Sequence, residues 1–196
     1  MSSTSTDTSA VTVVPETFTL VDYDAAEIAA VAAHVWQQVG LPAGQPLRIE
    51  VDESTPLGRA AVASAEPAVL TVESGALEHN HRPRQFDDQA SAQLFGRLLM
   101  RLRDRLDPAF GDAPSDDDLT LAQTAAWDAY AVGRVGRLGY PVQRQRRLYQ
   151  FRVRHGFTDT ADAVFEQLWT SDGLGWADID GLSAQAHARG EDRPTR

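Results

Sequence analysis

The 196-residue sequence contains no cysteine and no lysine. Without cysteine the chain has no disulfide bond, no thiolate metal ligand and no cysteine nucleophile. Without lysine it has no side-chain amine for Schiff-base chemistry. All 18 basic residues are therefore arginines, whose guanidinium groups stay protonated near neutral pH.

The sequence also lacks an excess of positive charge and any long apolar run. Its formal net charge is −10, which argues against binding to nucleic acid or to an anionic membrane surface, because both need a positive field. The N-terminal stretch has no basic segment followed by an apolar one, so we expect no signal peptide and no transmembrane span. A cytoplasmic protein is the resulting expectation.

The length suffices for one domain with a substantial core. Residues 1–15 are rich in serine and threonine and end at Pro15, which predicts a disordered N-terminal tail. Residues 189–196 are polar and predict a disordered C-terminal tail. Between them we expect a single domain over residues 16–188, with no internal repeat.

Periodicity divides this domain into a small sheet and a larger set of helices. Apolar runs predict three strands, and residues 16–22 are a possible fourth strand or an extended lead-in. Helical patterns dominate from residue 86 onwards. The fold class is therefore α+β, with a small, mostly N-terminal β-sheet packed on a helical array. The expected strands are 47–51, 59–63 and 68–72, and the expected helices are 24–38, 86–107, 119–138, 142–155, 160–169 and 176–187.

The helix over residues 86–107 has the clearest pattern in the chain. Its apolar residues share one arc at helical spacing, and Pro108 disfavours helix beyond it. Arg97, Arg101 and Asp104 form a second stripe on the opposite face, and any chemistry of this helix depends on that stripe. The apolar arc consists of Phe95, Leu98, Leu99, Leu102 and Leu106.

Glu78, His79 and His81 form the one local cluster with the chemistry of metal ligands. Two imidazoles two residues apart can bind a metal from an extended segment, with Glu78, Asp87 or Asp88 as a third ligand. Two ligands at such spacing also occur by chance. The alternative interpretation is an exposed polar loop between the sheet and the 86–107 helix.

Two charged stretches have ordinary structural explanations. Ser115 and the acidic residues 116–118 suit the N-cap and first turn of the next helix, and they lack the ligand spacing of a calcium-binding loop. The 142–155 helix carries an arginine run with interleaved aromatics, which could bind nucleic acid. A solvated face that pairs with the acidic remainder of the chain is the favoured interpretation.

Two short motifs carry a resemblance to a known family. The central helix ends in D-x-L-D-P-x-F-G, from Asp104 to Gly111, and a later helix contains W-D-x-Y-x-x-G-R, from Trp127 to Arg134. With a small sheet before them and helices after them, residues 45–180 resemble a bacterial group of minimal zincin-like metallopeptidases. The resemblance implies a zincin-like fold, in which the central helix carries the zinc-binding H-E-x-x-H motif.

The chain departs from that family at the motif itself. Aligned on D-x-L-D-P, the two zinc-binding histidines correspond to Arg97 and Arg101, and the glutamate corresponds to Leu98. A guanidinium has no lone pair for a metal, and leucine cannot act as a general base. Asp104 and Asp107 remain as relics of a site or as salt-bridge partners. The resemblance therefore implies a member that has lost peptidase chemistry.

We expect Arg97 and Arg101 to fill the former metal site and to pair with Asp104 or another acidic group. If the cleft stays open, the two arginines could instead bind a carboxylate or phosphate. The predicted function is non-catalytic, as an interaction or scaffolding module with no cofactor and an unidentified protein partner; the oligomeric state is left open. The alternative is a metal-dependent hydrolase that uses Glu78, His79 and His81.

Overall fold

The computed structural model describes residues 10–188, and these residues contain helices α1 to α6, a four-stranded sheet and a two-stranded sheet. The α+β prediction is confirmed. The chain divides into two compact units, one up to Arg103 and one from Asp104. Within the described residues, no helix is both long enough and apolar enough to cross a membrane.

The first unit contains all the strands. The strands are β1 (Val11–Val14), β2 (Leu47–Asp52), β3 (Ala60–Ser64), β4 (Ala68–Glu73), β5 (Glu78–His79) and β6 (Arg82–Phe86). Its helices are α1 (Ala25–Gln38), a 3-10 turn η1 (Ser74–Ala76) and the first part of α2 (Asp88–Leu106). Asp24 caps α1, since its side chain accepts a hydrogen bond from the Ala26 N–H at 2.7 Å.

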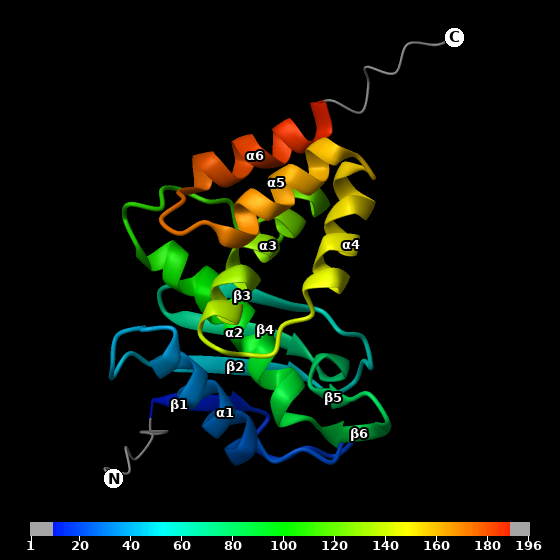
Figure 1. Cartoon of the computed structure of the whole chain (residues 1–196). Coiled ribbons are helices and arrows are strands. Elements are labelled where there is room, and N and C mark those ends of the chain that lie inside the picture. Colours follow the sequence, from blue (N-terminus) through cyan, green and yellow to red (C-terminus); the bar gives the residue numbers. More distant parts are fainter. Residues whose placement is uncertain (1–9, 189–196) are drawn as a thin grey trace. The chain divides into compact units, whose positions relative to one another are not determined.

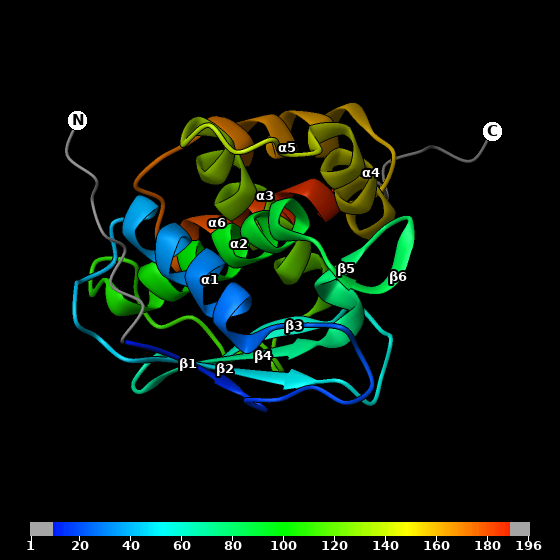
Figure 2. The same ribbon diagram turned by 90° about the horizontal axis from the view of Figure 1, so that it is seen from below.

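The four-stranded sheet has the order β1-β2-β4-β3, with β1, β2 and β4 parallel and β3 antiparallel. Alternation in β2 buries Leu47, Ile49 and Val51 and leaves Arg48 and Asp52 exposed, as period-2 patterning predicts. Helix α1 and the first-unit part of α2 lie over the same face of the sheet (Figures 1 and 2). On the opposite face β2 carries Arg48, Glu50 and Asp52.

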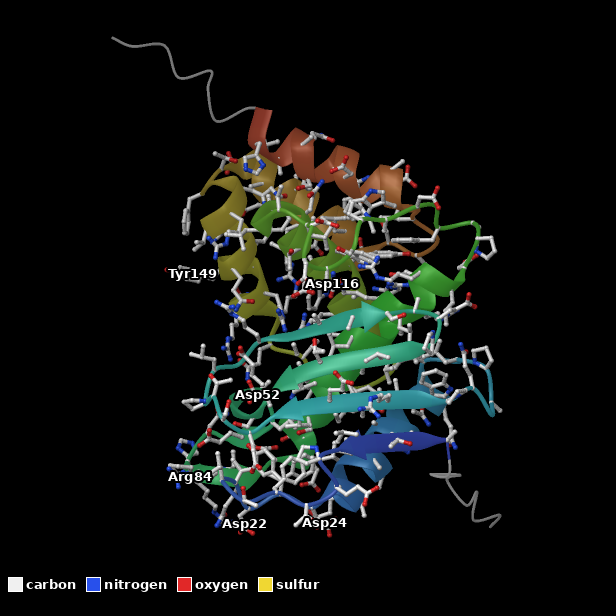
Figure 3. All side chains as sticks on the ribbon, turned by 180° about the vertical axis from the view of Figure 1, so that it is seen from behind. Asp22, Asp24, Asp52, Arg84, Asp116 and Tyr149 are labelled. Carbon is white, nitrogen blue, oxygen red and sulfur yellow. The ribbon has the colours of Figure 1, made fainter. Side chains whose placement is uncertain are left out.

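Strands β5 and β6 form a small hairpin where the sequence indicated a loop. Glu78 pairs with Phe86 and His79 with Arg82. The Asp22 N–H donates to the Arg84 carbonyl at 2.8 Å, and these two residues lie together in Figure 3. Arg84 has a φ of 63°, in the left-handed region that non-glycine residues rarely adopt. These few residues are mostly polar, so the alternation of apolar and polar residues was too weak to predict a strand.

The second unit is helical, and α3 is its centre. After the last turn of α2 it contains α3 (Leu121–Arg137), α4 (Arg144–His155), α5 (Asp159–Thr170) and α6 (Trp176–Ala188). Helix α3 packs against α4, α5 and α6 (Figure 1). At Gly133 the backbone of α3 approaches the Trp169 carbonyl so closely that a Cβ built there would lie 2.2 Å from the oxygen. The largest side chains of this core are Trp127, Tyr130, Phe110, Phe151 and Phe165.

Several boundaries differ from the prediction. The edge strand is β1, at Val11–Val14, inside the stretch expected to be a disordered tail, and residues 16–22 contribute only a bridge at Asp22. The tail prediction was wrong there, because Val11, Val13 and Val14 in this short Thr/Val run suit a parallel edge strand beside β2. The predicted C-terminal tail, 189–196, lies outside the described residues, as do residues 1–9. The single domain expected over 16–188 stays a prediction, and the structure is described as two compact units.

Helix α3 also begins later than expected. The sequence suggested Ser115 as its N-cap and Asp116–Asp118 as its acidic first turn, but Thr120 is the cap and forms a capping box with Gln123. The Ser115 hydroxyl instead donates to Asp118 within a turn, at 2.7 Å. Ser115 and Thr120 are both residues that can cap a helix. Only Thr120 is followed three residues later by a glutamine, which completes a capping box.

Candidate functional site

The three positions that the sequence analysis aligned with a zinc-binding motif are buried. Arg97, Leu98 and Arg101 have exposed fractions of 9%, 0% and 1%. The sequence placed the two arginines on the polar face of the helix, away from the core. Both arginines have interaction partners. A buried guanidinium needs such partners, because an isolated charge removed from water is strongly destabilising.

Asp104 is held on two sides by groups of α3. Arg134 donates from both terminal nitrogens to its two carboxylate oxygens, at 2.7 and 2.6 Å. The indole N–H of Trp127 donates to Asp104 Oδ2 at 2.8 Å. With only 5% of Asp104 exposed, the carboxylate is charge-paired and shielded from solvent. This arrangement suits a structural ion pair better than a metal ligand or a general base.

The Arg134 guanidinium also lies over the ring of Tyr130, with its central carbon 3.8 Å from the ring centroid. The Tyr130 hydroxyl accepts a hydrogen bond from the Leu174 N–H at 3.1 Å. Burial raises the pKa of Tyr130, so its hydroxyl remains protonated well above neutral pH. Tyr130 therefore packs against the Arg134 guanidinium, and its hydroxyl oxygen is bonded to the Leu174 N–H.

The two sequence motifs thus meet in one cluster of the second unit. Phe110 from the first motif stacks on Trp127 from the second, with ring centroids 5.1 Å apart. The Arg105 guanidinium lies 4.6 Å from the centroid of the same indole and pairs with Asp116 at 2.5 Å. Every polar group named here has a partner within hydrogen-bond distance. The residues of the two motifs consequently belong to a packed structural core with buried ion pairs.

Asp107, the other possible relic, has a different role. Its side chain is exposed, and its carboxylate accepts a hydrogen bond from the Ala109 N–H at 2.9 Å. That bond stabilises the turn after α2, where Pro108 prevents the helix from continuing. Asp107 is therefore not brought together with Asp104 in one site.

The Glu78, His79 and His81 segment lies on the β5–β6 hairpin. Glu78 Oε1 accepts the Arg84 N–H at 2.7 Å, and His79 Nδ1 accepts the His81 N–H at 3.1 Å. His79 Nε2 is 3.9 Å from an oxygen of Asp87. Over residues 10–188, no three histidine, aspartate or glutamate side chains are grouped so that they could hold a metal ion. The side chains of Glu78 and His79 therefore accept local hydrogen bonds from the hairpin backbone, and the His81 ring lies 6.1 Å from the His79 ring between centroids.

Most arginines of the α4 run form ion pairs. Three of its arginines bind carboxylates of the same unit, and Arg152 holds the pKa of Asp162 below its ordinary value by hydrogen bonding. This agrees with the favoured sequence interpretation of a face that pairs with acidic groups. The pairs are Arg144 with Glu166, Arg147 with Asp128 at 3.2 Å, and Arg152 with Asp162 at 2.5 Å.

Sequence reasoning did not single out His155 and Ser183, which form a buried pair. His155 Nε2 lies 2.9 Å from Ser183 Oγ, and Nδ1 lies 3.1 Å from the Phe151 carbonyl oxygen. Burial, with a smaller contribution from His187, lowers the pKa of His155 to about 4. The neutral ring stacks on Phe151 at 3.9 Å between centroids. Because both side chains are buried, a substrate has no access, and the pair joins α4 to α6.

Comparisons with protein-family models, with curated proteins and with solved structures gave no match to this chain.

Proposed function

We propose that this chain is a non-catalytic, zincin-like peptidase homologue that acts as an interaction or scaffolding module in the cytoplasm. One observation carries the proposal. The positions that the resemblance assigns to two zinc ligands and a general base hold Arg97, Leu98 and Arg101, and all three are buried in helix α2. The order of a small sheet followed by this helix supports the zincin-like part of the proposal.

The chemistry of these residues supports a lost activity. Two permanently protonated guanidinium groups repel a dication and offer it no lone pair, and Leu98 cannot deprotonate a water molecule. Asp104 could have compensated as a free carboxylate, but Arg134 and Trp127 occupy its oxygens. The stripe along α2 therefore contributes fold stability rather than proton transfer or metal binding.

The proposal is tested first by metal analysis and by a peptidase assay on the full chain, purified without chelator. We expect less than about a tenth of an equivalent of any transition metal, because a real structural or catalytic zinc site would stay loaded. We also expect no cleavage of casein or of a quenched fluorescent peptide library. Stoichiometric zinc together with hydrolysis, both lost in the His79→Ala/His81→Ala variant, would refute the proposal in favour of the hydrolase alternative.

A second test separates a structural role of the two arginines from anion binding. The Arg97→Ala/Arg101→Ala variant is expected to lower the melting temperature by more than about 10 °C, since it removes two buried charged groups from their partners. Titration of the wild-type chain with phosphate and with succinate is expected to give no binding heat. Saturable anion binding, lost in a variant that melts like the wild type, would show a ligand site instead.

A further inference from the structure

Helix α4 and the segment just after it present an aromatic and apolar strip to solvent. Tyr149 and Val153 lie on α4 and Phe157 lies two residues beyond its end, with exposed fractions of 60%, 48% and 66%. The rings of Tyr149 and Phe157 contact each other edge to face, with centroids 5.9 Å apart. Figure 3 shows Tyr149 pointing outward from α4. Large side chains grouped in this way mark contact sites more often than isolated ones do.

The strip lies beside a hollow whose other wall is formed by α3. This hollow has a volume of about 340 Å³ and lies between the first turns of α3 and the outer face of α4. Leu121, 63% exposed, and Ala125 line it from α3. Tyr149, Val153 and Phe151 line it from α4. Two helices with apolar side chains on both walls make a groove of the kind that receives the apolar face of a helical peptide.

The charge around the groove is positive, although the whole chain is strongly acidic. Within it, Asp128 is offset by Arg147, and the remaining lining charge is that of Arg154. Arg146 adds a second exposed guanidinium on α4. Over the part of the chain that the structure describes, Arg146 and Arg154 form no ion pair, unlike the other arginines of α4.

We propose that this groove between α3 and α4 binds an acidic amphipathic peptide segment of a partner protein. Leucine or aromatic side chains of the segment would enter the hollow against Tyr149 and Val153, and its carboxylates would pair with Arg146 and Arg154. This inference gives the proposed interaction module its contact surface, and it therefore rests on the proposed function.

The groove fits a peptide better than a nucleic acid. Three of the five arginines of α4 are neutralised by carboxylates, so only two remain to contact phosphates. A polyanion would also approach a chain with a net charge of −10. Affinity for nucleic acid comes mainly from many phosphate contacts, which this surface does not supply. Apolar walls next to isolated cations suit a short, mixed acidic and apolar segment.

The experiment is a selection from a random-peptide display library against the full chain, followed by binding of the enriched peptides, made synthetically, measured by fluorescence anisotropy. Enriched peptides are expected to combine aspartate or glutamate with leucine, phenylalanine or tryptophan at helical spacing. Arg146→Glu/Arg154→Glu is expected to weaken their binding by about tenfold or more, because both charge contacts become repulsive. Tyr149→Ser/Val153→Ser tests the apolar contacts and should weaken binding similarly.

The matched control reverses two exposed arginines of the first unit, Arg59→Glu/Arg82→Glu, with the same change in net charge. It is expected to bind like the wild type, and circular dichroism is used to check that every variant folds. Failure to enrich any peptide overturns the inference, as does binding that the groove variants leave unchanged. So does tight binding of poly-uridine, or a dimer in sedimentation that the groove variants dissociate. None of these outcomes alters the metal and peptidase results, so the two proposals fail separately.

Discussion

Arg134 binds both carboxylate oxygens of Asp104, at 2.7 and 2.6 Å, and this ion pair joins the last turn of α2 to the middle of α3. Both side chains are almost entirely withdrawn from solvent, with exposed side-chain fractions of 11% and 6%. An intact ion pair in this setting contributes little net stability. Removing one partner strongly destabilises the fold, because the other charge stays buried.

Asp104→Ala is therefore expected to lower the free energy of unfolding of the second unit by about 3 to 5 kcal/mol. The variant leaves the Arg134 guanidinium and the Trp127 indole N–H without their shared acceptor. Urea denaturation followed by circular dichroism measures the loss. Asp107→Ala is the control, since Asp107 is exposed and bonds only a turn, and it should cost less than about 1 kcal/mol. Equal losses in both variants would contradict the structural role of Asp104.

Gly133→Ala is expected to destabilise the second unit although alanine is the better helix former. The new Cβ would lie 2.2 Å from the Trp169 carbonyl oxygen, which is backbone and cannot rotate away. Forced separation of α3 and α5 should cost about 1 to 3 kcal/mol or more, against a propensity gain near 1 kcal/mol. Thermal melts give the sign directly.

Gly181→Ala serves as its matched control within α6. A Cβ at Gly181 would meet no atom within 4 Å, so only the helix propensity changes. This variant should gain up to about 1 kcal/mol. A gain at both glycines would mean that the close approach of α3 to Trp169 is not a constraint.

The stability of the second unit should depend on His155 between about pH 6.5 and pH 4. The pKa of His155 is lowered to about 4 in the folded chain, so at intermediate pH the unfolded chain binds a proton that the folded chain does not. This contribution to stability is complete above the unfolded pKa and is lost as the pH falls through this window, by about 3 kcal/mol in total.

Melting temperatures measured at intervals between pH 7.5 and pH 4 would show this slope. His155→Gln keeps a neutral hydrogen-bonding side chain next to Ser183 but does not titrate, and it should flatten that part of the profile. A wild-type slope that survives in His155→Gln would show that His155 is not its source.

Thr120→Ala should destabilise α3 by about 1 kcal/mol, because the capping box loses its side-chain acceptor for the Gln123 N–H. Ser115→Ala removes only a hydrogen bond within an exposed turn, and it should change stability by less than about 0.5 kcal/mol. Urea denaturation of the two variants under identical conditions compares them. A larger loss of stability in Ser115→Ala than in Thr120→Ala would support Ser115 as the N-cap instead.

Local patterning predicted much of the fold. The α1, α2 and α4 to α6 helices lie within about two residues of their expected bounds, because apolar residues recur at helical spacing in each. The β1 strand and the β5–β6 hairpin were missed, since four residues before Pro15 and a polar turn give too little alternation. Both are stabilised by partners distant in sequence, such as Leu47 for Val11.

The candidate site was less predictable than the fold. A helical projection put Arg97, Arg101 and Asp104 on one face, but projection cannot say what covers that face. The two short motifs meet in the structure, since Asp104 and Arg134 form an ion pair and Phe110 stacks on Trp127. The sequence analysis had expected Arg97 and Arg101 to pair with Asp104. Arg134 pairs with Asp104 because α3 packs against the end of α2. The periodicity of the sequence gives no information about such packing between helices.

The aromatic cluster around Trp127 has a practical consequence for spectroscopy. Three of the four tryptophans, at positions 127, 169 and 176, belong to the second unit, and only Trp36 belongs to the first. Substituting Trp36 by phenylalanine would leave a tryptophan emission signal, under selective excitation of tryptophan, that comes from the second unit alone. With such a variant, the unfolding of one unit can be recorded in the intact chain without any attached dye.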